Sequence, residues 1–286
     1  MVRMTYFRIL AAILPMLHAC TTWAVEQKVG FEIGIAPFLP VKTLVQNYAP
    51  LRDYLQNRLN VPVTIVSAPD YKTYYECIQK HDYPIIIAAA NSAYLAWSES
   101  AYIPLLKPLV YTRPVVVISK DKTLNKLTEL RGKSVAMSDV LAIVSMQGLQ
   151  MLREAGLEPE RDVTVKNMLN QGVAINFVIS GEVAAAIVSD RAILQMPLSI
   201  REQIKIVYTW DKGAAPGIVY LARPDMPGEQ IKQISRAIQE FARDVPEGKE
   251  LMKRWGYDGL VPITAEELQR LAPYGILLKV KISKIH

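Results

Sequence analysis

The stretch that decides the fold runs from Leu51 to Ala90 and reads LRDYLQNRLNVPVTIVSAPDYKTYYECIQKHDYPIIIAAA. It opens in an amphipathic helix, because Leu51, Leu55 and Leu59 recur at helical spacing. VPVTIVSA then reads as a strand, YKTYYECIQKH as a helix, and PIIIAAA as a strand with no polar alternation. A strand that is apolar on both faces indicates a parallel sheet covered by helices on each side. The stretch therefore predicts the β-α-β units of an open α/β sheet.

The same alternation extends to both sides of this stretch. Upstream, VGFEIGIA reads as a strand, and the helix that follows it carries Pro50, where we expect a kink. Downstream, LKPLVYTRPVVVISK reads as a long connection into a second unit, and GIVYLARPD as the connection that returns from it. The second unit has predicted strands and helices of its own, at 133–138, 145–156, 162–168, 176–181, 183–189 and 204–210.

We therefore predict a hinged clamshell of two α/β lobes, each an open, mostly parallel sheet flanked by helices. Residues 25–112 with 219–286 would form the first lobe, and residues 113–218 the second. Two crossings, near Tyr111–Val117 and Ile218–Ala222, would join them. Ligands of such folds bind at the carboxyl ends of the strands, so the cleft between the lobes is the expected site.

Residues 1–24 read as a secretory signal, with arginines first, then an apolar run from Ile9 to Leu17, then small residues. Two cleavage sites compete. Leu17–Cys20 resembles a lipobox, which would leave Cys20 lipidated, whereas Thr22–Ala24 suits ordinary signal peptidase and would release a soluble chain. Both predict export to the periplasm.

Composition and motifs argue against several classes of function. Lysine and arginine number 33 against 27 acids in 286 residues, an excess too small to indicate nucleic-acid binding. There is no G-x-S-x-G, H-E-x-x-H, Walker or G-x-G-x-x-G sequence, and only three histidines. We therefore expect neither an enzyme nor a metal or cofactor site, and we expect a monomer.

Motifs spread over nearly the whole chain carry a family resemblance. They are GIAPFLP, NSAYLAW, LTELRGKSVAM, LREAGLEP, ISGEVAAAIV and VPEGKELMKRWGYDGLVPIT, in this order. Together they make the chain similar to the phosphonate/phosphite-type substrate-binding proteins of bacterial ABC importers, which have the type II periplasmic-binding-protein fold. The resemblance implies a two-lobed binder that hands its ligand to a membrane partner.

The resemblance also implies an anion site, from which this chain departs. In the family a Ser-Thr-Ser-Gly-like run at a helix start holds the phosphonate oxygens, and here that run falls on residues 142–145, Ala-Ile-Val-Ser. Asp139 and Gln171 match polar positions of the family, whereas Ala184 and Ile85 stand where acids are common. Losing two or three hydrogen bonds to a charged oxygen would cost roughly 4–8 kcal/mol. We therefore predict that the chain does not bind simple phosphonates tightly.

The expected pocket is an apolar cleft with a few polar groups, which suits a larger organic ligand. Its candidate residues are Phe38, Tyr71, Asn91, Ser92, Tyr94, Arg113, Ile143, Val144, Ser145, Gln171 and Ser189.

Each candidate has a structural alternative. Tyr71, Tyr94, Ile143 and Val144 could be packing residues, and Phe38 could only fix a loop. Asn91 and Ser92 could cap a turn or a helix, and Arg113 could form an ion pair at the hinge. Of the tyrosines in YKTYYECIQKHDY, at most one or two can reach the cleft, and the others would pack on an amphipathic surface.

Three non-catalytic functions remain open. The first is the solute-binding component of an uptake system, which docks on a membrane permease. The second is a ligand-sensing subunit of a membrane histidine kinase. The third is a periplasmic carrier of a lipid- or sterol-like molecule, which the apolar loop at 142–144 favours modestly.

Overall fold

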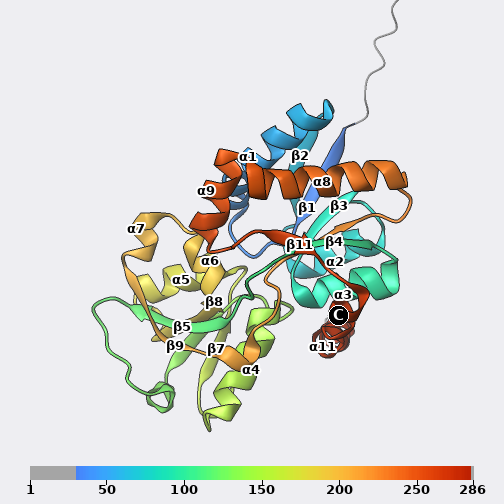
Figure 1. The fold of residues 1–286 in the computed structure, drawn as a ribbon. Helices are drawn as coiled ribbons and strands as arrows, with labels where there is room; N and C mark the ends of the chain where they lie inside the picture. Colours follow the sequence, from blue (N-terminus) through green and yellow to red (C-terminus); the bar gives the residue numbers. More distant parts are fainter. Residues whose placement is uncertain (1–29, 285–286) are drawn as a thin grey trace, which may run out of the picture.

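The computed structural model describes residues 30–284, which form two sheets side by side (Figure 1). The predicted signal segment and its two cleavage sites lie outside these residues. The first sheet has the order β11-β4-β10-β3-β1-β2, and its strands are β1 (Phe31–Ile35), β2 (Val63–Ser67), β3 (Ile85–Ala88), β4 (Ile103–Pro108), β10 (Val219–Ala222) and β11 (Leu260–Pro262). The second has the order β7-β6-β8-β5-β9, and its strands are β5 (Pro114–Ser119), β6 (Ser134–Met137), β7 (Thr164–Asn167), β8 (Ala185–Ser189) and β9 (Ile204–Thr209).

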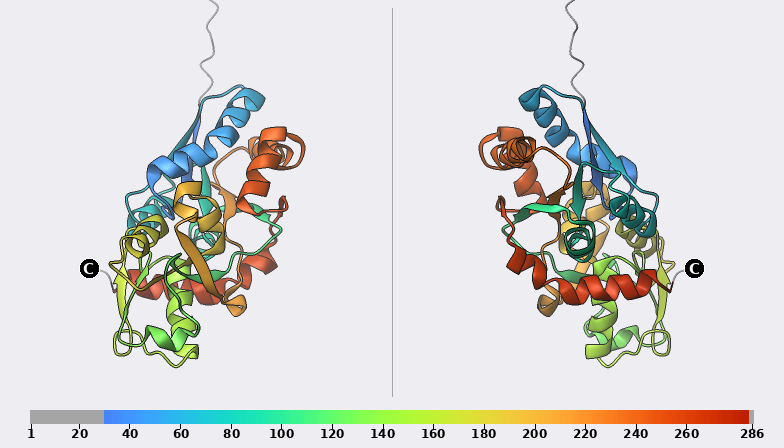
Figure 2. Two further views of the ribbon diagram at one scale, coloured as in Figure 1. Left: turned by 90° about the vertical axis from the view of Figure 1, so that its left-hand side faces the viewer. Right: turned by 90° about the vertical axis from the view of Figure 1, so that its right-hand side faces the viewer.

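Helices cover both sheets and define two lobes. The first lobe carries α1 (Val41–Leu59), α2 (Tyr71–Gln79), α3 (Ala90–Ser100), α8 (Gly228–Asp244), α9 (Pro246–Trp255), α10 (Ala265–Gln269) and α11 (Ala272–Ile282). The second carries α4 (Ile143–Glu154), α5 (Gln171–Ile179), α6 (Asp190–Leu194) and α7 (Leu198–Arg201), and short 3-10 turns span Leu127–Leu130 and Asp211–Gly213. Figure 2 shows from two sides how α11 runs beneath the first lobe, where it packs on α3.

The fold class predicted from the sequence is confirmed, but two connections were misread. The segment 106–120 is not one long connection, because it holds the end of β4 and the whole of β5, so that the crossing is only 109–113. The segment 217–225 likewise contains β10, which pairs antiparallel with both β3 and β4. The return crossing is therefore 210–218, and Ile218–Ala222 mostly belongs to the sheet. The lobe boundaries at 112/113 and 218/219 stay a prediction.

The core of the first lobe explains a further correction. Tyr74 and Tyr75, expected on an amphipathic surface, are both buried. The Tyr74 hydroxyl lies 3.2 Å from the carbonyl oxygens of Gly34 and Ile87, so α2 is fastened to two strands of the sheet. Helix α1 contains Pro50 and continues to Leu59, and the kink expected there stays a prediction.

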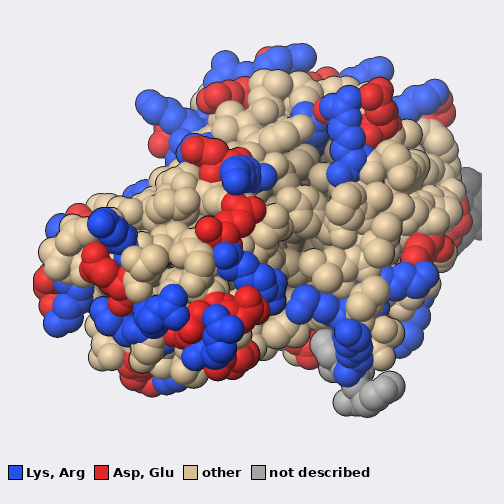
Figure 3. All heavy atoms as spheres, turned by 90° about the horizontal axis from the view of Figure 1, so that it is seen from below, with Lys and Arg blue, Asp and Glu red and all other residues tan. Residues whose placement is uncertain are grey.

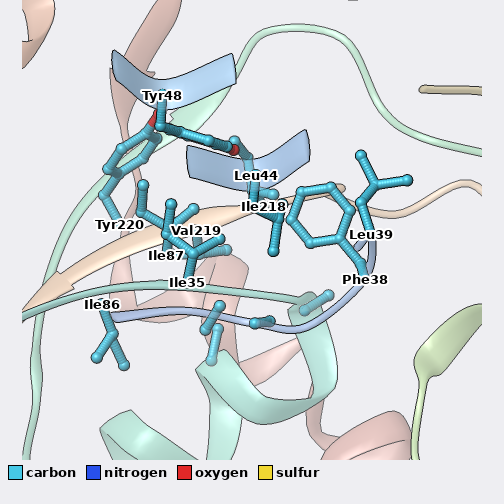
Figure 4. Packing of buried hydrophobic residues seen from close by; sticks show 14 of the residues in the cluster. Ile35, Phe38, Leu39, Leu44, Tyr48, Ile86, Ile87, Ile218, Val219 and Tyr220 are labelled. Atoms are coloured by element: carbon cyan, nitrogen blue, oxygen red, sulfur yellow. The ribbon is translucent and has the colours of Figure 1, made fainter. Parts of the chain in front are cut away.

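The loop after β1 connects this core to the space between the lobes. Figure 4 shows the Phe38 ring beside Ile218, in the cluster that also holds Ile35 and Leu44. Phe38 is thus anchored by the first lobe at the carboxyl end of a parallel strand. This is the edge of the sheet where the sequence predicts the site.

Three hydrogen bonds to backbone carbonyls join the lobes across that space. The Gln171 N–H donates to the Phe38 carbonyl at 3.2 Å, and the Asn91 amide donates to the Leu141 carbonyl at 2.9 Å. The Asn47 amide of α1 donates to the carbonyl of Gln195, just after α6, at 3.1 Å. The two lobes are therefore in a closed arrangement.

Surface charge gives no sign of a nucleic-acid site on the face seen from below. Figure 3 shows basic and acidic side chains interspersed on that face, without a broad area of one sign. Among the helices formed by residues 30–284, none is both long enough and apolar enough to cross a membrane.

Candidate ligand-binding site

A pocket lies between the two lobes and takes its walls from both of them. It measures about 600 Å³ when its open mouth is included. The first lobe contributes Phe38, Tyr71, Ala89 and Tyr257, the second contributes the start of α4, Gln171, Ser189 and α6, and the crossings contribute Thr112, Arg113 and residues 215–218. Carboxyl ends of strands from both sheets thus face one pocket, which is where open α/β folds bind ligands.

Seven of the eleven candidate residues line this pocket, and four do not. The seven are Phe38, Tyr71, Arg113, Ile143, Val144, Gln171 and Ser189. The remaining four, Asn91, Ser92, Tyr94 and Ser145, have other partners, described below. A role in ligand binding stays a prediction for all eleven.

The start of α4 has the form of an anion site with a hydrocarbon lining. The N-cap residue Ala142 makes no side-chain cap, and within the described chain the N–H groups of Ile143 and Val144 have no acceptor. The Ser145 N–H bonds back to the Ala142 carbonyl at 3.1 Å. Free N–H groups and the positive end of the helix dipole favour negative charge at this point. The side chains of Ala142, Ile143 and Val144 nevertheless bring no hydroxyl to them.

Ser145 cannot supply that hydroxyl because it is fully buried and faces β6. Its Oγ donates to the Ser138 carbonyl at 3.0 Å and lies 3.2 Å from the Ser138 hydroxyl. The Ser145 side chain therefore ties the start of α4 to the strand behind it. We had expected it in the cleft, and the helical rotation from Ile143 to Ser145 explains the difference.

The three other candidates that do not line the pocket make contacts with other parts of the protein. The Asn91 amide bridges to Leu141 of the opposite lobe, and the Ser92 hydroxyl donates to the Ala89 carbonyl at the start of α3. The Tyr94 ring packs edge-on to Trp97 and against Gly275 of α11. Tyr94 therefore holds α11 to α3 on the outside of the cleft.

Gln171 presents a defined donor to the pocket. Its Oε1 accepts the backbone N–H of Ser189 at 2.6 Å, and only the oxygen of the amide can accept a proton. The orientation of the amide is thereby fixed. Its Nε2 group is a donor that has no acceptor among residues 30–284. The Ser189 hydroxyl is used as the N-cap of α6, where it accepts from Ala192 N–H at 3.1 Å.

Arg113 lines the pocket, but its charge is paired. Its Nε lies 3.3 Å from Asp190 and its Nη1 3.0 Å from Asp211, and its backbone N–H donates to Asp190 as well. The hydrogen bond to Asp211 is the main cause that raises the pKa of Arg113. The structural alternative, an ion pair at the hinge, is therefore present in the molecule.

Two apparent losses of family acids do not concern the pocket. Ile85 is the first residue of β3 and fully buried, and Ala184 directly precedes β8. Both stand at the amino ends of their strands, whereas the pocket lies at the carboxyl ends. Of the departures read from the sequence, only the one at 142–144 faces the ligand space.

Several lining residues were missed by the sequence reasoning. They are Ala89, Thr112, Pro114, Ala142, Gln147, Arg191, Ala192, Gln195, Ala215, Pro216, Gly217, Ile218 and Tyr257. Arg191 had a usable signal, because it follows the buried strand VAAAIVS at its carboxyl end. Tyr257 had none, since it follows α9 and reaches the pocket only through the tertiary fold.

Burial raises the pKa of the two tyrosine hydroxyls that line the pocket. Desolvation raises the pKa of Tyr71, and the nearby Asp139 carboxylate raises it further. Desolvation also raises the pKa of Tyr257 to about 12, against the opposing effects of Thr112 and the Arg191 cation. Both phenols are therefore neutral hydrogen-bonding groups at physiological pH. No cluster of metal-ligating side chains occurs between residues 30 and 284.

Two α/β lobes closed over an interlobe pocket define the class of two-lobed solute-binding proteins. Residues 33–268 match the family model of the phosphonate periplasmic substrate-binding proteins of ABC transporters, and the chain belongs to this family. No curated protein matches its sequence significantly.

Solved structures show the same fold at low sequence identity. PhnD1 from Prochlorococcus marinus in complex with methylphosphonate has a TM-score of 0.75 at 13% identity, over 87% of this chain and 98% of its own. A binding protein component of an ABC phosphonate transporter from Pseudomonas aeruginosa has 0.74 at 14%, over 89% of each chain. The periplasmic aliphatic sulphonate binding protein SsuA from Escherichia coli has 0.59 at 15%, over 88% and 87%.

Proposed function

We propose that this chain is a non-catalytic solute-binding component of an importer, which closes around a small organic ligand and delivers it to a membrane permease. The observation that carries the proposal is the pocket whose walls come from both lobes. A ligand in that pocket would bridge the lobes, so binding would stabilise the closed arrangement. The solved structures of this fold include a complex with methylphosphonate and an aliphatic sulphonate binding protein, and both names point to small solutes.

The lining of α4 supports a ligand with an apolar part. Ala142, Ile143 and Val144 bring hydrocarbon to a helix start whose free N–H groups remain available. A helix N-terminus alone contributes on the order of 0.3–1 kcal/mol, up to about 2 kcal/mol when it is partly buried. This is less than the hydroxyl contacts that a tightly bound phosphonate would need. Simple phosphonates are therefore expected to bind weakly.

The kinase-sensor and lipid-carrier alternatives would use the same closure. The enclosed space of the pocket is only about 50 Å³, which favours a small solute over a long-chain lipid or a sterol. Genes adjacent to this one distinguish the alternatives, since a permease with an ATPase, a histidine kinase or an efflux transporter would each mark one of them.

A thermal-shift screen of the exported chain from Val25 onward tests the proposal. One plate holds phosphate, phosphite, alkylphosphonates, sulfonates and carboxylates, and the other holds lipids and sterols with detergent-matched controls. Ligands that bind only the folded state raise the melting temperature. We expect shifts with small organic solutes. A large shift with phosphate or methylphosphonate would contradict the expectation that this pocket binds simple phosphonates weakly. Shifts confined to the lipid plate would favour the lipid-carrier alternative.

A further inference from the structure

Two buried polar atoms without partners converge on the interlobe pocket. Over residues 30–284, seven buried side-chain nitrogen or oxygen atoms lack a hydrogen-bond partner of good geometry. Two of these seven, Arg191 Nε and Gln195 Oε1, belong to residues that line this one pocket, and a third, Thr112 Oγ1, has there only a weak interaction with the Tyr257 hydroxyl, whose pKa it lowers. Because buried polar groups in folded proteins are nearly always paired, such a cluster calls for an explanation. A bound molecule that supplies the missing partners would provide one.

Arg191 is the charged member of this cluster. Its guanidinium makes no hydrogen bond or ion pair with any other described residue. Arg113, the second arginine of the pocket, differs in this respect, because the buried carboxylate of Asp190 and the exposed one of Asp211 neutralise it. No carboxylate lines the pocket. Of the two arginines that line the pocket, Arg191 is therefore the one without a carboxylate partner among residues 30–284.

The closed lobes hold Arg191 in place. A side chain at Gly256, which ends α9 of the first lobe with a φ of +68°, would come within 2.6 Å of Arg191 Nη1. The backbone of the first lobe thus approaches the guanidinium of α6 as closely as glycine permits. The C-terminal end of α9 offers partial negative charge, but that is a weaker partner for a half-buried cation than a full anion.

We infer that the ligand is a small organic monoanion, a carboxylate or a sulfonate, whose charged group is held by Arg191. The inference rests on the solute-binding function proposed above. One unpaired cation matches one negative charge, whereas a dianion would leave an excess charge buried and a neutral solute would leave the guanidinium unpaired. The planar donor fork of arginine suits either anion. Ile143 and Phe38 then face the organic part, and Thr112 and Gln195 can bond to a further polar group of the ligand.

The test compares probes with alkyl chains of three or four carbons that differ in charge: butanoate, butanesulfonate, butylphosphonate and butanol. Dissociation constants are measured by calorimetry at pH 9, where butylphosphonate is mainly a dianion, for the unaltered protein, Arg191→Gln, Arg191→Lys and Arg201→Gln. Arg201 is the matched control, because its Nε is also buried without a partner, yet it lies outside the pocket. We expect a monoanion to bind tightest, and Arg191→Gln to weaken it about ten- to a hundredfold. Arg201→Gln should change it less than threefold.

The outcomes separate this inference from the proposed function. If Arg191→Gln binds the monoanions as well as the unaltered protein does, or if butanol binds equally well, the role of Arg191 is wrong and solute binding stands. If butylphosphonate binds tightest of the four probes, the inference that the ligand is a monoanion is also wrong. If no member of the panel binds and the wider solute screen also yields nothing, both proposals fail. Arg191→Lys keeps the charge without the fork, and an intermediate loss is expected.

Discussion

At the scale of single residues, Ile143 decides what the start of α4 can hold. Its side chain lines the pocket beside N–H groups that have no acceptor, so its chemistry sets which ligand can use them. Replacing it tests the hydrocarbon lining directly, because the backbone site itself is left intact.

We expect Ile143→Ser to weaken butanoate about five- to tenfold, because roughly 1 kcal/mol of apolar contact is lost from a half-buried side chain. The same change should strengthen butylphosphonate, since the new hydroxyl can donate to a charged oxygen. Calorimetric titration of both probes measures the change in selectivity. Leu149→Ser, on the same helix but outside the pocket, is the control. Unchanged or stronger butanoate binding to Ile143→Ser would show that the lining does not select the ligand.

The carboxyl group of Asp139, which precedes α4, is partly buried, and burial disfavours its charged form. Desolvation raises the pKa of its carboxyl above the ordinary 3.8, nearby Asp70 adds to this, and the Leu141 N–H opposes it. A folded pKa above the unfolded value means that stability is lost as pH rises through the folded pKa. The ionised carboxylate therefore destabilises the fold at neutral pH.

We expect Asp139→Asn to raise the melting temperature at pH 7, because the amide oxygen can still accept the Leu141 N–H without the charge. The gain should shrink as pH falls through the folded pKa and vanish below 3.8, where both forms are neutral. Asp121→Asn is the control of opposite sign, since the Ser119 hydroxyl lowers the pKa of that exposed carboxyl. A gain for Asp139→Asn that does not depend on pH would rule out the charge as its cause.

At the scale of elements, the packing of α11 explains why Tyr94 lies outside the pocket. A Cβ at Gly275 would come within 2.2 Å of the Tyr94 ring, so the two helices meet where one of them has no side chain. The sequence motif NSAYLAW suggested a ligand contact for Tyr94. The motif cannot show which face of α3 is covered by a helix more than 170 residues further along the chain.

We expect Gly275→Ala to destabilise the protein by about 1–3 kcal/mol, because the ring must shift in a packed interface. Urea unfolding measures the loss, and butanoate affinity should stay within twofold, because the change lies outside the pocket. Gly228→Ala is the control, since a Cβ there meets nothing within 4 Å. A large loss of affinity in Gly275→Ala, with stability unchanged, would return Tyr94 to the site.

The sequence predicted elements better than it predicted side-chain directions. Apolar strands such as 85–88 and helices with regular leucine spacing could be predicted, because their sequence patterns are local. The strand β10 was hidden in an apparent connection, since its partners β3 and β4 lie over 100 residues away. Ser145 was assigned to the pocket, although only the seating of α4 on β6 shows that it turns away.

At the scale of the whole molecule, closure combines apolar packing between the lobes with few direct hydrogen bonds. Across the cleft, Phe38, Leu141 and Gln195 each accept one hydrogen bond from the opposite lobe. Each such bond contributes only about 0.5–1.5 kcal/mol. The closed state is therefore expected to be sensitive to single changes that never touch the ligand, because affinity falls in proportion to the population of the competent state.

We expect Asn47→Ala to weaken butanoate binding about three- to tenfold, because α1 loses its bond to the Gln195 carbonyl and the closed state becomes less populated. Small-angle scattering of the ligand-free protein should show a larger radius of gyration, which saturating butanoate then restores. Asn57→Ala is the matched control, an exposed asparagine on the same helix. If Asn47→Ala and Asn57→Ala bind alike and scatter alike, this bond does not hold the lobes together, and closure depends on the ligand and on the remaining interlobe contacts.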